Sequence, residues 1–230
     1  LSIHHKLLLT VLIVSLSCFL LVKHSLTYDH PKIETIDETY SSLPKIQGVV
    51  LPKGQTLLDF SLVNHLNQTF NKKSLIGKWH FITYGYTQCP DICPTTLFTL
   101  TQVAEKLTEQ KQKDSTSFLF YSIDSQRDSI EVLANYIQYF DDSFIAVKTN
   151  NLAEQEKFES NLGIKVNITK TDNNYQVSHG LNIFLINPEG KLQAVFIPKR
   201  TELGIEHLTS EHIFKGYQQV KSYYQKQPAS

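Results

Sequence analysis

Two cysteines, Cys89 and Cys93, are the side chains of this sequence best suited to carry chemistry. They are separated by three residues in the string Cys-Pro-Asp-Ile-Cys-Pro, which lies between an apolar segment and a helical pattern. Backbone N–H groups at the start of a helix stabilise a thiolate, the form that binds metals and exchanges disulfides. The spacing is wider than the C-x-x-C of thioredoxins and leaves room for a metal ion, of which soft thiolates favour Cu(I) or Zn.

A pair of cysteines is not specific by itself, so a structural disulfide or two buried thiols stay as alternative interpretations. Two ligands are also few for a stable metal site, and a third is expected elsewhere. His179 is the best candidate because it lies just before the predicted strand 181–186, and the loop entering this strand lies beside the cysteine loop in a thioredoxin layout. With the two cysteines it would form a trigonal site of one nitrogen and two sulfurs.

Asp124 opens a second polar string, which ends at Asp128. We predict that Asp124 ends a strand at the same sheet edge as Cys89 and tunes a bound metal as an outer partner of its ligands. The alternative is that the string forms a helix cap and an ion-pair cluster at the start of the next helix, since Asp and Ser are good caps.

The apolar pattern predicts an α/β fold of the thioredoxin type, a central mixed sheet with flanking helices. Strands are expected at 79–86, 118–124, 144–147, 181–186 and 193–197, and helices at 97–107, 130–140, 152–162 and 208–224. The turn Asn187-Pro188-Glu189-Gly190 joins the last two strands in an antiparallel hairpin. The apolar residues of 57–66 predict an extra hairpin ahead of this layout.

An uncharged apolar run at 7–22, bracketed by Lys6 and Lys23, predicts one N-terminal transmembrane helix. Its sixteen residues span only about 24 Å as a helix, but snorkelling lysines can extend it toward the hydrocarbon thickness of about 30 Å. We expect a retained single-pass anchor that holds the domain on the periplasmic or outer face of the cytoplasmic (inner) membrane. The alternatives are a cleaved signal peptide and a lipoprotein signal that uses Cys18.

The chain of 230 residues is interpreted as a membrane anchor at 1–26, a polar tether at 27–50 and a folded domain at 51–226. Lys and Arg together number 22, as do Asp and Glu, so the formal net charge is zero. A nucleic-acid binder would carry a strong basic excess, so this class is excluded.

The motifs resemble the Sco/SenC family of cytochrome oxidase assembly proteins over about residues 51–224. The resemblance rests on Tyr-Gly-Tyr-Thr-Gln-Cys-Pro-Asp-Ile-Cys-Pro at 84–94, on 124–128, and on His179 followed by Phe-Leu-Ile-Asn-Pro-Glu-Gly at 184–190. It implies a thioredoxin fold and one copper ion, Cu(I) or Cu(II), held by Cys89, Cys93 and His179. It also implies delivery of copper to the dinuclear copper A centre of cytochrome c oxidase subunit II, or reduction of that centre's cysteines.

Two positions depart from the family's usual pattern. Ser125 stands where members usually have Pro, and Ser178 stands where they usually have Asp before the histidine. Neither departure removes a predicted ligand. The absent Asp takes a charge away from the neighbourhood of His179, and the absent Pro leaves a less constrained loop.

Two rival functions use the same residues. The first is an enzyme, a thiol–disulfide oxidoreductase that uses Cys89 and Cys93 without metal, and the second is a peroxidase on the same fold. The peroxidase is the weakest reading, because nothing beyond the fold points to a peroxide site. His179 separates the two leading functions, since a copper site needs it and a reductase does not.

Overall fold

The computed structural model describes residues 15–20, 23, 42–171, 174–201, 204–206 and 208–227. The chain divides into two units, 1–41 and 42–230. In the first unit residues 15–20 are helical, while most of the predicted anchor at 7–22 lies outside the described residues. The described residues include no helix that is both long enough and apolar enough to span a membrane.

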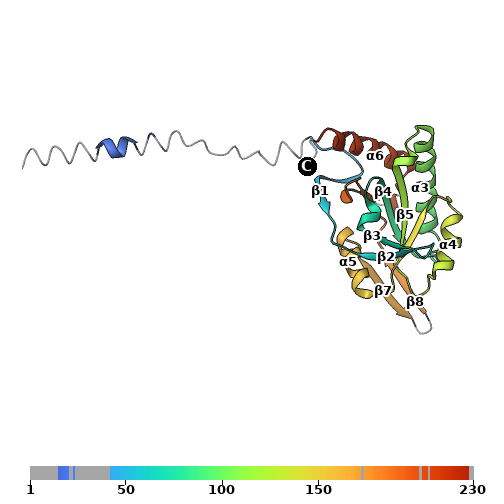
Figure 1. Ribbon diagram of the computed structural model, residues 1–230. Helices are drawn as coiled ribbons and strands as arrows, with labels where there is room; N and C mark the ends of the chain where they lie inside the picture. The colour runs from blue at the N-terminus through green and yellow to red at the C-terminus, as the bar shows by residue number, and fades with distance from the viewer. Residues whose placement is uncertain are drawn as a thin grey trace, which may run out of the picture. The chain divides into compact units, whose positions relative to one another are not determined.

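The second unit, 42–230, contains both strands and helices (Figure 1). Its described strands are β1 (Gly48–Thr56), β2 (Ser61–Asn64), β3 (Thr69–Asn71), β4 (Trp79–Gly85), β5 (Thr116–Ser122), β6 (Ile145–Lys148), β7 (Val166–Thr171), β8 (Asn174–His179), β9 (Ile183–Ile186), β10 (Lys191–Phe196), β11 (Lys199–Thr201) and β12 (Gly204–Glu206). Its described α-helices are α3 (Ile92–Glu109), α4 (Ile130–Gln138), α5 (Leu152–Leu162) and α6 (Ser210–Gln225).

Eight strands form one mixed sheet in the order β1-β10-β9-β4-β5-β6-β2-β3. The central strands β4, β5 and β6 are parallel, and each connection between them contains a helix, α3 or α4. The β9–β10 hairpin adds antiparallel to the other edge of β4. This mixed sheet with flanking helices confirms the predicted α/β architecture.

The sheet buries both faces, because alternate residues of its central strands point to opposite sides. In β5, Phe118 and Phe120 belong to the cluster that includes the apolar faces of α3, α4 and α6. Leu119 and Tyr121 belong to the opposite cluster, which includes Phe158 of α5. The ends of β4 and β5 are thereby fixed from both sides, and the loops that follow them start from rigid positions.

Several parts of the described fold differ from the prediction. The structure has a first strand, β1, which begins three residues before the expected domain boundary at 51 and pairs with β10. The extra N-terminal hairpin is β2–β3, which lies at 61–71 and thus later than the expected 57–66. A further hairpin, β7–β8, has no counterpart in the prediction, so His179 ends a strand instead of lying in a loop.

Candidate metal centre

The cysteine loop runs from the end of β4 at Gly85 to the start of α3 at Ile92. Its Cys89 N–H donates to the Tyr86 carbonyl at 3.1 Å, which tightens the loop into a turn. The Cys93 N–H then donates to Cys89 Sγ at 3.4 Å. The predicted helix-start environment of the pair is therefore present, since a first-turn N–H of α3 points at a cysteine sulfur.

The two cysteines differ in exposure. Both are free thiols, and Cys93 is buried while Cys89 is only partly buried. A Cβ atom placed on Gly85 would lie 2.3 Å from Cys93 Sγ, far inside van der Waals contact. Glycine at the end of β4 therefore leaves the space that the buried sulfur occupies.

His179, the last residue of β8, lies beside this buried sulfur, with its Nε2 atom 3.8 Å from Cys93 Sγ. Its Nδ1 atom lies 2.6 Å from the Gly180 carbonyl oxygen. A carbonyl can only accept, so Nδ1 carries the proton and Nε2 presents its lone pair toward the cysteines. The rings of Tyr84 and Tyr86 pack against the imidazole, at centroid distances of 5.2 and 6.2 Å.

Two of the three predicted ligands, Cys89 and His179, line one hollow of the surface, and Cys93 is buried next to His179. The lining of this hollow includes Tyr86, Cys89, Pro90, Asp91, Ile92, Val177, His179 and Leu181. Among the residues that the structure describes, no three His, Cys, Asp or Glu side chains are spaced as a complete metal site. Cys89, Cys93 and His179 are therefore neighbours rather than a closed coordination shell.

The cysteines share their protons unequally. A hydrogen bond from the Cys93 thiol lowers the pKa of Cys89 to about 4, with hydrogen bonds from backbone N–H groups adding to the effect against the opposing effect of burial. The same hydrogen bond and burial raise the pKa of Cys93. At neutral pH the pair is a Cys89 thiolate that accepts from a Cys93 thiol.

Iodoacetamide is expected to alkylate Cys89 of the reduced chain at a nearly constant rate between about pH 6 and about pH 8, because the thiolate is the nucleophile. The rate should fall only as the pH approaches the lowered pKa of about 4. The measurement is the alkylation rate against pH, followed by peptide mass spectrometry. A rate that rises through the ordinary thiol pKa of about 8.5 would contradict the assignment.

Cys93→Ala is the control for this measurement. It removes the hydrogen bond that contributes most to the low pKa of Cys89. The rate profile of Cys89 should then move toward higher pH.

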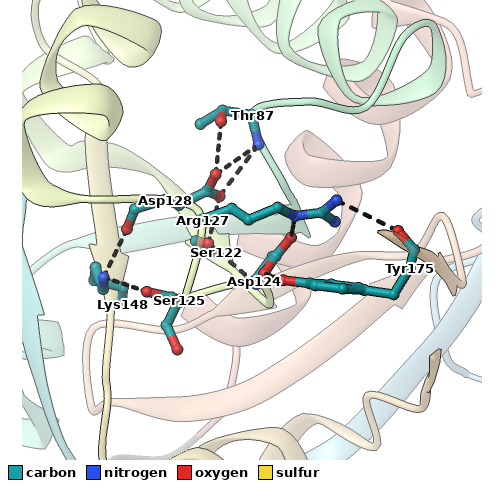
Figure 2. Close-up of polar contacts among 8 residues, drawn as sticks. All are labelled: Thr87, Ser122, Asp124, Ser125, Arg127, Asp128, Lys148 and Tyr175. Carbon is teal, nitrogen blue, oxygen red and sulfur yellow. Dashed lines mark hydrogen bonds and ion pairs between the residues drawn. The ribbon is translucent and has the colours of Figure 1, made fainter. Parts of the chain in front are cut away.

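Asp124 lies just beyond the end of β5, as predicted, but it faces other partners than the ligands. Its carboxylate pairs with Arg127 Nε and accepts a hydrogen bond from the Tyr175 hydroxyl (Figure 2). The helix cap of α4 is Ser129, whose Oγ accepts from the Val132 N–H at 3.1 Å. The alternative interpretation expected an ion-pair cluster and a helix cap in this string. The ion pair is present, whereas a capping role for Asp124 is wrong.

Asp128, which ends this string, has a buried role that its sequence position does not indicate. Its carboxylate is fully buried and accepts from Thr87 Oγ1 and Ser122 Oγ, each at 2.6 Å, and from the Thr87 N–H (Figure 2). Thr87 belongs to the cysteine loop, so Asp128 ties this loop to the end of β5. The Lys148 ammonium donates to the Asp128 and Ser125 carbonyls, each at 2.6 Å. These bonds hold the turn at Ser125, the position where family members usually have Pro.

A family model and curated relatives both match this chain, and the family model covers the cysteine loop and His179. Residues 51–211 match the family model described as SCO1/SenC. The chain is 37% identical over 135 residues to the SCO2-like protein of Rickettsia typhi, covering 57% of this chain and 65% of that protein. It is 30% identical over 138 residues to the human mitochondrial protein SCO1 homolog, covering 60% of this chain and 46% of that protein.

Solved structures agree with the sequence matches. The crystal structure of yeast Sco1 with copper bound superposes with a TM-score of 0.62 at 25% identity, over 76% of this chain and 96% of that chain. The matched region amounts to about half to two thirds of the length of the two curated relatives above.

Proposed function

The chain belongs to the SCO1/SenC family, and we propose that it is a membrane-anchored protein that delivers copper to the dinuclear copper A centre of cytochrome c oxidase subunit II during assembly of the respiratory complex. The observation that carries the proposal is the contact between Cys93 Sγ and His179 Nε2. The two atoms are 3.8 Å apart, although the two residues are separated by 86 positions in the sequence. A partly buried thiolate, Cys89, adjoins them.

We assign one copper ion per chain to Cys89, Cys93 and His179, as cargo. Two thiolates and an imidazole are donors that suit Cu(I). The imidazole nitrogen is also a suitable ligand for Cu(II). The solved yeast Sco1 holds copper, which supports the assignment for a relative of the same fold. Because the pKa of Cys93 is raised, its proton must leave when copper binds, so the affinity falls as the pH is lowered.

A second candidate function is reduction of the cysteines of the same centre. The unequal protonation of the pair favours it, because a Cys89 thiolate is a ready nucleophile. In this reaction the Cys89 sulfur attacks one sulfur of the partner's disulfide and forms a mixed disulfide. Cys93 then loses its proton and attacks Cys89, which releases the partner's dithiol and leaves a Cys89–Cys93 disulfide. The partner gains the two electrons that this chain loses.

Copper transfer separates the two functions. The full chain, loaded with one Cu(I), is mixed with the metal-free soluble domain of subunit II with its cysteines reduced, and the copper of each protein is measured after separation. We expect copper to move to that domain. In the parallel arm, the metal-free reduced chain is mixed with the oxidised domain. Retention of all copper by the chain, together with loss of the domain's disulfide, would favour the reductase.

Membrane anchoring through 7–22 is part of the proposal and rests on the apolar, uncharged character of that segment. It places the domain on the periplasmic or outer face of the inner membrane, within reach of a membrane-embedded partner. Release of the full chain without detergent would contradict anchoring.

A further inference from the structure

The hairpin that carries His179 is separate from the main sheet. Strands β7 and β8 pair with each other, from Val166 opposite His179 to Thr171 opposite Asn174, and form a two-stranded sheet of their own. An isolated two-stranded hairpin is only marginally stable in water. Side-chain contacts with the domain must therefore hold His179 in place.

The side chains available for this task lie on one face of β8. Residues 175, 177 and 179 alternate with their neighbours and so point to the same side. Val177 is 6% exposed and lines the hollow together with His179. Tyr175 lies four residues from His179, which is about 13 Å along a strand. The face that presents His179 to the cysteines thus presents Tyr175 to the turn after β5.

Tyr175 meets that turn in a compact set of contacts, which we call the latch and define as Asp124, Arg127 and Tyr175. The Tyr175 hydroxyl donates to Asp124 Oδ1, and Arg127 Nε pairs with Asp124 Oδ2 (Figure 2). Arg127 Nη1 donates to the Tyr175 carbonyl at 3.3 Å. The guanidinium carbon also lies 3.9 Å from the centroid of the Tyr175 ring.

The Asp124–Arg127 ion pair of the latch is largely protected from solvent, which makes it worth more than a surface ion pair. The Asp124 side chain is 3% exposed and that of Arg127 is 18% exposed. The guanidinium also lies 5.5 Å from the ring of Tyr86, whose own ring packs against His179. Arg127 therefore lies between the hairpin and the cysteine loop.

We propose that the latch positions His179 against the cysteine pair by holding the β7–β8 hairpin to the turn after β5. The same turn fixes the cysteine loop through Asp128 and Thr87. One short segment, 124–128, is thus the common base for both halves of the metal centre. The inference rests on the proposed function for its effect on copper, and it makes Asp124, Arg127 and Tyr175 positioning residues that act through His179.

The first test is amide hydrogen exchange of the metal-free full chain, measured on peptides from the hairpin. Arg127→Gln should increase exchange in 166–179 about tenfold, and Tyr175→Phe should increase it less, because it keeps the ring beside the guanidinium. Lys113→Gln is the matched control, since it breaks the Lys113–Asp141 ion pair of 3.0 Å in another part of the domain. Unchanged exchange of the hairpin in both latch variants would overturn the proposal.

The second test is a double-mutant cycle on Cu(I) affinity. Arg127→Gln should weaken binding about 10-fold in the parent, in the range expected for groups that orient a ligand. In the His179→Ala background the same change should cost less than about twofold, because the latch has no ligand left to position. Arg127→Lys should restore part of the affinity.

The outcomes of the two tests are distinguishable. Equal weakening by Arg127→Gln in both backgrounds would overturn the proposal, because the latch would then not act through His179. Equal copper affinity of the parent and His179→Ala would instead refute the proposed ligand set, and the exchange of the hairpin would alone decide whether the latch holds it.

Discussion

Cys93→Ser is expected to abolish tight Cu(I) binding by the reduced full chain, and Cys89→Ser is expected to do the same. The parent should hold one equivalent of copper after gel filtration in the presence of a competing chelator. The physical reason is that a serine hydroxyl does not ionise at neutral pH and is a hard ligand, so each change removes one of the two soft donors. His179→Ala should also remove tight binding, because two ligands are few for a stable site.

The chain supplies a matched control for these variants. Cys18 lies in the N-terminal segment, far in sequence from the pair, and Cys18→Ser should leave one copper per chain. The affinity of each variant is measured by titration against a chelator of known Cu(I) affinity. A His179→Ala chain that holds Cu(I) as firmly as the parent would refute the third ligand while leaving the cysteine pair in place.

Asp128→Ala is expected to destabilise the domain by about 1–3 kcal/mol for each buried donor that loses its acceptor. Its carboxylate is fully buried and is the acceptor for the Thr87 N–H, the Thr87 hydroxyl and the Ser122 hydroxyl. The variant leaves these three donors without that acceptor, and unsatisfied buried donors are costly. The measurement is urea unfolding of the metal-free chain.

Asp59→Ala is the control for this second variant. The Asp59 side chain is 94% exposed and lies 3.8 Å from Lys72, so its loss should change stability by less than about 0.5 kcal/mol. Equal unfolding midpoints for Asp128→Ala and Asp59→Ala would show that the buried network does not hold the cysteine loop.

The part of the fold that the sequence predicted is the part with a strong apolar period. β4 is buried along its whole length and β5 at all but one position because both faces of the sheet are covered, and α3 repeats its buried residues at helical spacing. The cysteine pair was predictable for the same reason, since it stands between β4 and α3. The β9–β10 hairpin was predictable from the Asn187–Gly190 turn.

The parts that the sequence did not predict depend on pairings between distant residues. The β7–β8 hairpin is rich in polar residues and pairs only with itself, and its apolar residues alternate with polar ones over only a few positions, which is a weaker signal than a continuous buried run. Tyr175 is 51 positions from Asp124, and nothing in either string indicates the contact. Asp128 reads as a surface charge, and only its position beneath Thr87 and Ser122 makes it part of the core of the site.

The most direct measurement of the central claim is thiol trapping of the parent with and without copper. The reduced full chain is treated with an alkylating reagent, either metal-free or with one equivalent of Cu(I), and the labelled cysteines are identified by mass spectrometry. Cys18 serves as the internal standard, because copper at the predicted site does not cover it. We predict that one equivalent of Cu(I) protects Cys89, the reactive thiolate of the metal-free chain, while Cys18 is labelled equally in the two samples. Full labelling of Cys89 in the copper-loaded chain, at the metal-free rate, would show that this sulfur does not hold the metal.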